Sequence, residues 1–349
     1  MIINTHNDWD PLEEIVVGHA HGARISMEKS MHSFNFADKR AHEVAHIDGA
    51  YPDWLINEAN EDIDLLADTL SKMGVRVHRP ARQDFNREFS TPNWSTRGYH
   101  AWCPRDLILP LGDMLIETPV AVRSRYFETD AYRDILLEAF RDNALWIAAP
   151  RPRLLDSMFD LERDVRGRPT LMDHEIVFDA PNVVRIGRDL LYQISNSGNI
   201  KGFQWLKRLL EPRGYRLHYS ELYSYAHFDS TIIPLRPGLV LLNSARVSPA
   251  NCPEVFAKWD KIYFEDCVLT NTGVDGWVSP CSPYIAMNIL SVDHETVIVE
   301  ENQHPLMREL ERYGINCVPL RFRHAQSLAG GFHCVTLDLR RRGSLEDYC

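Results

Sequence analysis

Residues 183–219 read VVRIGRDLLYQISNSGNIKGFQWLKRLLEPRGYRLHY and predict one complete folding unit. Two aliphatic runs flank a turn at Gly187, which is typical of a β-hairpin. Phe203, Leu206 and Leu210 then recur three and four residues apart, as on one face of a helix. A last short apolar run supplies a third strand. The segment therefore predicts the order strand, strand, helix, strand.

The same order recurs along most of the chain. The hairpins are expected at residues 107–118, 183–194, 231–243 and 288–300. The helices are expected around residues 131–141, 203–210, 253–259 and 305–313. The closing strands are expected at residues 145–148, 215–219, 262–264 and 316–320. Four units of roughly fifty residues are the signature of a repeat architecture.

The two ends of the chain supply a fifth unit when they are joined. A strand follows Cys334, a second strand spans 14–18, and a helix ended by Gly74 leads to a third strand at 75–78. Units that cannot bury their own faces stack on neighbours, and closing first onto last hides exposed edges. The sequence predicts one α/β domain over residues 1–349, a five-bladed α/β propeller of ββαβ modules with pseudo-fivefold symmetry. The alternative, an open doubly wound sheet, lacks support because no G-x-G-x-x-G is present.

Composition excludes several classes of function. The chain has 349 residues, 44% hydrophobic and 25% charged, as expected for a globular protein. Its net charge of −11 disfavours nucleic acid and anionic membranes as partners. The basic run Arg340–Arg342 is expected to be a solvated strand end. No signal-peptide pattern is present and no apolar run reaches the roughly 18 residues of a membrane span, so we expect a cytoplasmic protein.

The seven cysteines are scattered, and none forms a C-x-x-C pair. This pattern is not typical of a disulfide-stapled secreted domain or of a structural zinc site. We predict no metal and no cofactor. Five of the cysteines are expected to be packing or exposed residues: Cys103, Cys252, Cys267, Cys317 and Cys349.

The residues before each hairpin carry most of the reactive side chains. If the units are equivalent, these residues lie at one end of the ring near its axis, although the chain separates them widely. The segments are CPRD at 103–106, FDAPN at 178–182, HFDS at 227–230, CS at 281–282 and HC at 333–334. The predicted fold therefore gathers carboxylates, imidazoles and a thiol in one place.

This set of groups suits covalent catalysis, because only a thiolate attacks and a neighbouring base or positive charge must supply it. The additional aspartates indicate a cationic substrate. A guanidinium is planar and permanently charged, so carboxylates can grip it edge-on with its carbon facing a sulfur. The sequence therefore predicts arginine or a relative as the substrate.

Five segments carry a family resemblance. They are HNDWDPLEEIVVG (6–18), CPRDLILPLGD (103–113), FDAPN (178–182), HFDSTIIPLRPGLVLLNSARV (227–247) and SLAGGFHCVTLDLRRRG (327–343). In this order they resemble the arginine amidinotransferases, both glycine amidinotransferase and, more closely, the inosamine-phosphate amidinotransferase of aminoglycoside pathways. The resemblance runs from Asn7 to Tyr348. It implies the five-bladed fold and transfer of the amidino group of arginine to an amine, with release of ornithine.

The resemblance also implies roles for three catalytic residues. Cys334 attacks the guanidinium carbon and forms an amidino-cysteine intermediate. His227 protonates the departing ornithine amine and later deprotonates the acceptor amine, while Asp179 holds its ring.

The remaining site residues implied by the resemblance bind the donor. Asp106 and Asp229 hold the guanidinium. Arg246 pairs with the substrate carboxylate and Ser282 lies beside it, whereas Cys281 is expected to be a packing residue. The expected partners are small-molecule substrates and, as the common default for a soluble enzyme, a second copy of the chain.

The acceptor amine is not determined by these residues. An aminocyclitol phosphate, lysine, another amino acid or a pathway-specific amine all remain open. Glycine-using relatives carry a bulky apolar residue before the histidine, whereas Ala226 stands here with Ser224 nearby, so an acceptor larger than glycine is expected. No glycine-rich phosphate loop is present, and Arg123 and Arg125 are expected to be salt-bridged at the surface or at the edge of the core.

The sequence also offers three rival functions. His42-Glu43-Val44-Ala45-His46 is a literal H-E-x-x-H, which on a continuous helix would place two imidazoles for zinc. Gly49 and Pro52 follow closely and no third ligand is evident, so a solvated loop or short helix is the expectation. Water in place of the amine would make the protein an arginine deiminase that yields citrulline, and residue types alone do not decide between these outcomes. A non-catalytic propeller would be expected to lack part of the polar set, and no part is missing.

Overall fold

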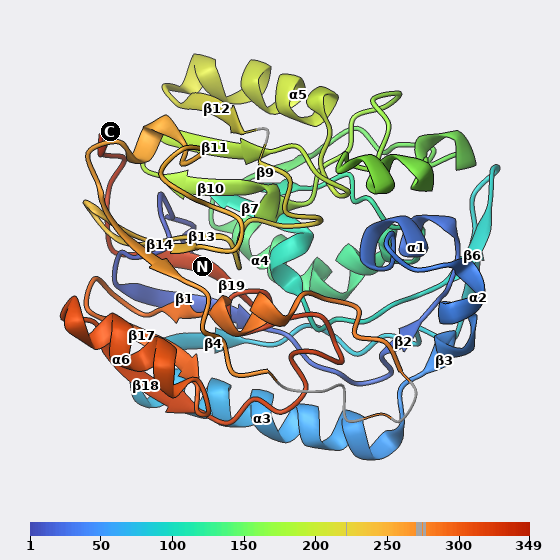
Figure 1. Ribbon diagram of the computed structural model, residues 1–349, viewed down its shortest axis with the longest axis horizontal. Coiled ribbons are helices and arrows are strands. Elements are labelled where there is room, and N and C mark those ends of the chain that lie inside the picture. The colour runs from blue at the N-terminus through green and yellow to red at the C-terminus, as the bar shows by residue number, and fades with distance from the viewer. Residues whose placement is uncertain (221, 270–273, 275–276) are drawn as a thin grey trace.

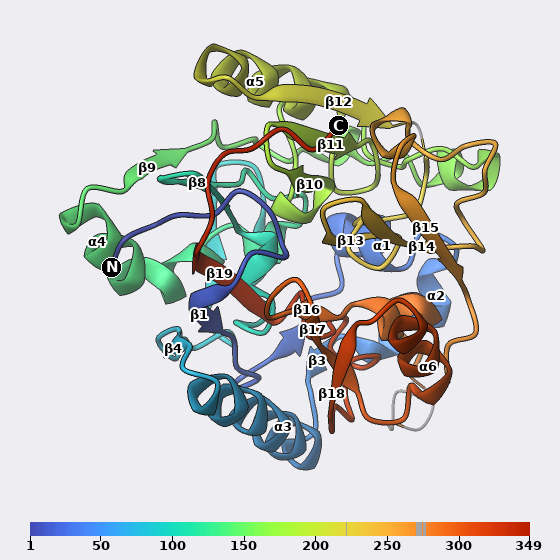
Figure 2. The same ribbon diagram turned by 90° about the vertical axis from the view of Figure 1, so that its left-hand side faces the viewer.

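A computed structural model of the protein describes residues 1–220, 222–269, 274 and 277–349. Within these residues lie five three-stranded sheets that share one topology (Figures 1 and 2). In each sheet the middle strand pairs antiparallel with one neighbour and parallel with the other. The sheets are β7 (Ile108–Leu111), β8 (Met114–Glu117), β9 (Leu145–Ala148); β10 (Val183–Ile186), β11 (Asp189–Gln193), β12 (Arg216–Ser220); β13 (Ile232–Arg236), β14 (Leu239–Asn243), β15 (Asp260–Phe264); β16 (Leu290–Ser291), β17 (Thr296–Glu300), β18 (Asn316–Leu320); β19 (Thr336–Arg341), β1 (Leu12–Val17), β4 (Arg76–His78).

The last of these sheets joins the two ends of the chain, as the sequence predicts. Strand β1 pairs antiparallel with β19 and parallel with β4. Three of the other hairpins turn at glycines with positive φ, which are Gly112, Gly187 and Gly238, and Gly187 between β10 and β11 has a φ of 65°. An added Cβ there would lie 2.3 Å from the Glu346 carbonyl oxygen, so only glycine fits this turn.

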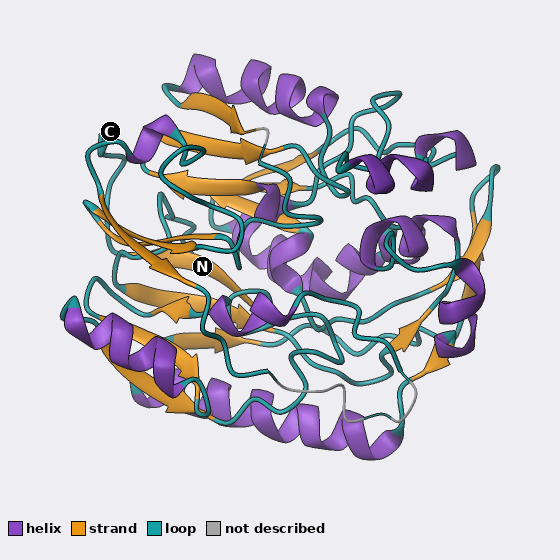
Figure 3. Ribbon diagram, viewed as in Figure 1, coloured by secondary structure: helices purple, strands orange, loops and turns teal. Residues whose placement is uncertain are grey.

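Helices α3, α4, α5 and α6 lie on the outer side of the sheets (Figures 2 and 3). The helices are α1 (Lys29–Asn35), α2 (Ala41–Val44), α3 (Asp53–Lys72), α4 (Arg133–Arg141), α5 (Ile200–Leu210) and α6 (His304–Arg312). Each of α3 to α6 precedes the last strand of its sheet, as predicted. The helix expected around residues 253–259 is only the 3₁₀ turn η9 (Glu254–Phe256). Pro253 directly precedes that turn and the next strand already begins at Asp260. No helix within the described residues is both long and apolar enough to cross a bilayer.

Five hydrophobic clusters fill the spaces between the sheets, and each cluster takes residues from two sheets. Alternate residues of one strand enter different clusters: Val240 and Leu242 pack toward the β10 sheet, whereas Leu239 and Leu241 pack toward the β16 sheet. This alternation is expected for a strand that is buried on both faces. The clusters join the β19 sheet to the β7 sheet, β7 to β10, β10 to β13, β13 to β16, and β16 back to β19.

One expectation about a charged residue is wrong. Arg341, in the basic run at the end of β19, is buried rather than solvated, with 1% of its surface exposed. Its guanidinium donates to the Asp338 carboxylate at 2.8 Å and to the backbone carbonyls of Asp10 and Ser291. Asp338 lies three residues earlier on the same strand. Because it pairs with Arg341, the guanidinium charge is stabilised in the interior and does not need to reach solvent.

Candidate active site

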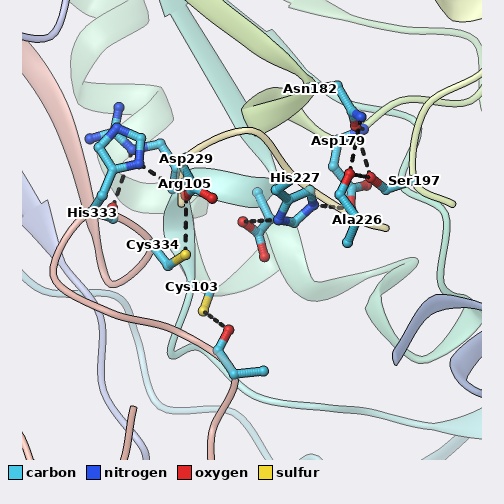
Figure 4. A network of polar contacts seen from close by, with 12 residues as sticks. Cys103, Arg105, Asp179, Asn182, Ser197, Ala226, His227, Asp229, His333 and Cys334 are labelled. Carbon is cyan, nitrogen blue, oxygen red and sulfur yellow. Dashed lines mark hydrogen bonds and ion pairs between the residues drawn. The ribbon is translucent and has the colours of Figure 1, made fainter. Parts of the chain in front are cut away.

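The residues that precede the first strands of the sheets come together around a cavity of about 650 Å³. Its walls also include the segment that follows α1 and the loop before His227. The predicted site residues that line it are Asp106, His227, Asp229, Arg246, Ser282 and Cys334. The remaining one, Asp179, lies behind the His227 ring (Figure 4). The structure therefore brings all seven predicted site residues into one region.

The Cys334 thiol is held in a fixed position just before β19. Its backbone N–H donates to the Asn288 side-chain carbonyl at 2.9 Å, and its Sγ lies 3.1 Å from Asp229 Oδ2 (Figure 4). The Asn288 amide also donates to the Asp229 backbone carbonyl at 3.2 Å. One asparagine thus fixes the sulfur and the carboxylate relative to each other.

The two glycines before Cys334 permit this close packing. A Cβ on Gly330 would lie 2.6 Å from Cys103 Sγ and 3.1 Å from Cys334 Cβ, and one on Gly331 would lie 2.7 Å from Asn288 Cβ. Real Cβ contacts do not reach such distances, so any other residue would displace the loop. The Gly330-Gly331 pair is required by packing rather than by flexibility.

Replacing Gly330 by alanine should therefore move Cys334 away from Asp229. We expect a loss of turnover of about 10²-fold, since a displacement on the scale of 1 Å at the reacting group has that effect. Gly314→Ala is the matched control: Gly314 has a φ of 73° and open space around its Cα. That variant should lose about 1–2 kcal/mol of unfolding free energy through backbone strain and keep its turnover. Steady-state kinetics measures the loss of turnover, and denaturant unfolding measures the loss of stability. Equal turnover in the two variants would contradict the packing role given to Gly330.

The protein environment keeps the Cys334 thiol protonated when the cavity holds no substrate. A hydrogen bond with the Cys103 side chain, burial, and the negative charge of Asp229 all raise the pKa of Cys334 well above its ordinary value. Figure 4 shows the Cys103 sulfur beside that of Cys334. A positive charge placed among these carboxylates would reverse the largest charge effects and favour the thiolate.

Alkylation by iodoacetamide tests this protonation state. In the substrate-free protein, modification of Cys334 should be slow at neutral pH and should accelerate as pH rises past about 9, because the thiolate fraction grows as pH approaches a raised pKa. Peptide mapping after alkylation distinguishes Cys334 from the six other cysteines. A rate that is already constant with pH below 7 would show a preformed thiolate and contradict the prediction.

The imidazole of His227 is paired with a buried carboxylate. His227 Nε2 lies 3.1 Å from Asp179 Oδ2, and the other oxygen of Asp179 accepts the Ala121 backbone N–H at 3.2 Å. Asp179 begins the 3₁₀ turn η7 (Ala180–Asn182), where Asn182 hydrogen-bonds back to its N–H. The local sequence FDAPN therefore fixes the carboxylate that orients the ring.

The charge state of His227 follows from its neighbours. Burial lowers the pKa of this imidazole, but the charge of Asp106 and the hydrogen bond and charge of Asp179 outweigh burial and raise it to about 9. His227 Nδ1 also lies 3.7 Å from Asp106 Oδ1. At neutral pH the ring is an imidazolium that can donate a proton into the cavity.

Two further carboxylates flank the sulfur and the imidazole. Asp106 Oδ2 accepts from Arg125 Nη1 at 2.5 Å, whereas its buried Oδ1 has no hydrogen-bond partner among the described residues. Burial raises the pKa of Asp229, but the hydrogen bond and charge of His333 and the charge of His227 outweigh it and hold that pKa below its usual range. Both aspartates can therefore receive a cation.

The arginines near this site divide into two kinds. Arg125 is buried and also pairs with Glu128 at 2.8 Å, and Arg123 pairs with Asp156 at 2.6 Å, so both are salt-bridged as expected. Arg246 differs, because it forms no ion pair with the described residues. It donates to Thr231 Oγ1 at 2.8 Å and lies 5.4 Å from the centre of the Tyr284 ring. An unpaired guanidinium at the cavity wall is suited to a carboxylate ligand.

Sequence reasoning missed three contributors to the site. Cys103, expected to be only a packing residue, lines the cavity beside Cys334. Asn288 sits two residues before the short strand β16, so the rule that found the other pre-strand residues could also have found it. The segment from Phe34 to Lys39 also lines the cavity, and nothing in its sequence signals that position.

The H-E-x-x-H segment does not form one continuous helix. Helix α2 ends at Val44 and a separate 3₁₀ turn (Ala45–Ile47) follows, with His42 and His46 both exposed. The Glu43 carboxylate accepts the Arg40 backbone N–H at 2.6 Å and so caps its own helix. Among the described residues there is no group of three or more His, Cys, Asp or Glu placed to hold a metal ion.

Comparisons with known proteins agree with this geometry. The chain is 44% identical over 349 residues to inosamine-phosphate amidinotransferase 1 of Streptomyces glaucescens, covering 99% of both chains. It is 35% identical to the L-arginine:L-lysine amidinotransferase of Pseudomonas savastanoi pv. phaseolicola, covering 99% of this chain and 96% of that protein. The solved structure of the inosamine-phosphate amidinotransferase of Streptomyces griseus superposes with a TM-score of 0.93 at 43% identity over 99% of both chains. No protein-family model matches the chain.

An α/β fold with a thiol, an imidazolium and carboxylates in one cavity defines a candidate for covalent group transfer. With the identities above, the chain belongs to the amidinotransferase family and is an enzyme that transfers amidino groups.

Proposed function

We propose that the protein takes the amidino group of L-arginine onto Cys334 and passes it to the amine of a small acceptor, with release of ornithine. The observation that carries this proposal is the 3.1 Å contact between the Cys334 sulfur and Asp229 in a cavity that also contains the Asp179-paired His227. The relatives above are named for amidino transfer, and one of them is named for arginine as donor.

The groups around the sulfur favour a cationic carbon over an acyl group. An acyl electrophile needs N–H donors for its oxyanion, but the Cys334 N–H is already bonded to Asn288. Carboxylates of Asp106 and Asp229 flank the sulfur instead. In the proposed complex they hold two edges of the guanidinium. Its positive charge favours the thiolate, and the thiol proton leaves to solvent, because His227 already carries its own proton.

The other end of arginine fits the far wall of the cavity. Arg246, which has no acidic partner among the described residues, pairs with the α-carboxylate of the donor. Ser282, which begins η10 (Pro283–Met287) and whose hydroxyl accepts the Tyr284 N–H at 3.2 Å, lies beside that carboxylate. Two fixed ends orient the guanidinium carbon toward the sulfur.

In the first half-reaction the Cys334 thiolate attacks the guanidinium carbon and a sulfur–carbon bond forms. The imidazolium of His227 gives its proton to the departing nitrogen, the carbon–nitrogen bond breaks, and ornithine leaves. In the second half-reaction neutral His227 removes a proton from the acceptor amine. The amine attacks the amidino carbon, the sulfur–carbon bond breaks, and the thiolate and imidazolium are restored.

The acceptor we propose is an amine larger than glycine, with an aminocyclitol phosphate as the first candidate. Ala226 and Ser224, both small, line the cavity beside His227 and leave space at the point where the acceptor must approach. The relatives at 44% and 35% identity are named for inosamine phosphate and for lysine, both larger than glycine.

We also infer that the five sheets are the blades of one closed ring with pseudo-fivefold symmetry and that residues 1–349 form one domain. Five clusters that join each sheet to the next, and the last to the first, support closure. The cytoplasmic location and the homodimer stay predictions.

Incubation with arginine and a panel of amines tests the proposed function. We expect repeated turnover, in which ornithine beyond one equivalent of enzyme accumulates together with a guanidinylated product, only when an acceptor larger than glycine is present, with both products followed by mass spectrometry. Faster reaction with glycine than with bulkier amines would contradict the acceptor argument. Citrulline in place of a guanidinylated product would assign the hydrolytic alternative, a deiminase.

A further inference from the structure

His333 directly precedes Cys334 but does not line the cavity. Figure 4 shows its ring beside Asp229, and the second ring nitrogen faces Asp8. Nδ1 is 3.0 Å from Asp229 Oδ2, and Nε2 is 3.5 Å from Asp8 Oδ1. Neither contact takes part in the proton transfers proposed for His227.

The oxygen that His333 contacts is the one that receives the Cys334 thiol. Asp229 Oδ2 lies 3.0 Å from the imidazole nitrogen and 3.1 Å from Cys334 Sγ. Rotation of the carboxylate away from the imidazole would therefore also break its contact with the sulfur. His333 determines both where this carboxylate points and what charge it faces.

Asp8 is itself held in a rigid buried frame. It forms an ion pair with Arg185, and Arg105 Nη1 lies 3.4 Å away. Arg185 and Arg105 both bind Asp338 on β19, at 2.9 Å and 2.6 Å. Three segments far apart in the chain thus fix the carboxylate that receives His333 Nε2.

We propose that His333 and Asp8 are positioning residues for the donor half-reaction, which keep the Asp229 carboxylate ionised and aimed beside the Cys334 sulfur. The inference rests on the proposed function, because an ionised Asp229 matters only if a cation binds there. It assigns to the half-buried His333–Asp8 pair a role distinct from that of His227, which faces the cavity and handles protons.

The electrostatic surroundings support this role. Asp229 faces the His333 ring, the His227 imidazolium and the Cys334 thiol. His333 faces Asp229 and Asp8, and its backbone carbonyl accepts from Arg105 Nε at 3.3 Å. Burial on its own raises the pKa of Asp229, so removal of His333 leaves a carboxylate that takes up a proton at a higher pH.

Arginine binding to the Cys334→Ser protein tests the proposal without turnover, because serine retains a hydroxyl for Asp229. Affinity is measured by isothermal titration calorimetry at several values between about pH 6 and pH 8. The Cys334→Ser parent should bind arginine with the same affinity across this pH range. His333→Ala in this background should bind at least about tenfold more weakly at the acidic end than at the basic end, since one unit of pKa is tenfold in affinity.

Three further variants complete the experiment. Asp8→Asn should also bind arginine more weakly at acidic than at basic pH, with a smaller difference than His333→Ala. His333→Asn, which keeps an N–H near Asp229, should restore part of the arginine affinity. His218→Asn is the matched control, because His218 pairs with Asp189 at 2.7 Å outside the cavity and should bind as the parent does. If His333→Ala does not fold, Asp8→Asn and His333→Asn carry the test.

A loss of affinity that is equal at every pH, or no loss at all, would overturn the positioning role. Failure of the Cys334→Ser parent itself to bind arginine would overturn the proposed function and this inference with it. The two failures are distinguishable because the first appears only in the His333 and Asp8 variants.

Discussion

Cys334→Ser should lower the turnover of arginine by at least about 10⁴-fold, the scale of losing a covalent nucleophile. The serine hydroxyl can keep the hydrogen bond to Asp229, but its far higher pKa leaves no attacking anion among these carboxylates. Because the shape and charge of the cavity are preserved, the affinity for arginine should change little. Steady-state kinetics with ornithine as the readout, together with calorimetric titration of arginine, measures both quantities.

Cys317→Ser is the control for this substitution. Cys317 lies on β18 and packs with the residues around α6, away from the cavity. It should keep turnover within a few-fold of the unmodified protein, since an isosteric change outside the site has little effect. Turnover in Cys334→Ser within tenfold of this control would remove Cys334 from the mechanism.

Asp179→Asn should lower kcat/KM for arginine by about 10²–10⁴-fold at neutral pH, the usual contribution of a general acid. The charge of Asp106 and the hydrogen bond and charge of Asp179 together raise the pKa of His227 to about 9, whereas burial acts in the opposite direction. With the charge of Asp179 removed, only Asp106 and Asp229 still oppose burial, so the pKa of His227 falls and a larger fraction of the rings is neutral at pH 7. A neutral ring has no proton for the departing ornithine.

NMR titration of labelled histidine checks the cause of this loss. In the unmodified protein the His227 resonance should titrate near pH 9, and in Asp179→Asn it should titrate at a lower pH. His227→Asn should lose about as much activity as the double variant, because the two residues act as one unit. An unchanged titration in Asp179→Asn would contradict the electrostatic account even if activity fell.

The repeating fold was predictable because its signals are local. The turn at Gly187 and the helix face of Phe203, Leu206 and Leu210 require no knowledge of distant residues, and the pairing of β1 with β19 follows from the incomplete units at the two ends. The prediction was less accurate at η9, where a short helix was expected. Periodicity alone cannot separate one 3₁₀ turn from a short helix.

The candidate site was predictable where its residues lie just before the first strand of a sheet. That rule places Cys334, His227 and the aspartates together before any coordinate is known. It says nothing about the Cys103 thiol touching Cys334 or about the burial of Arg341, because both depend on packing between separate sheets. The raised pKa of Cys334 in the empty cavity is likewise a property of the assembled carboxylates and not of the GGFHC segment.

The most direct test of the account is to mix the protein with arginine alone, quench in acid, and measure the intact mass. The account predicts a mass increase of one amidino group, located on the peptide that contains Cys334, together with one equivalent of ornithine. The Cys334→Ser protein should show neither. An unmodified mass with ornithine still released only when an acceptor is present, or an amidino group on another residue, would contradict transfer through Cys334.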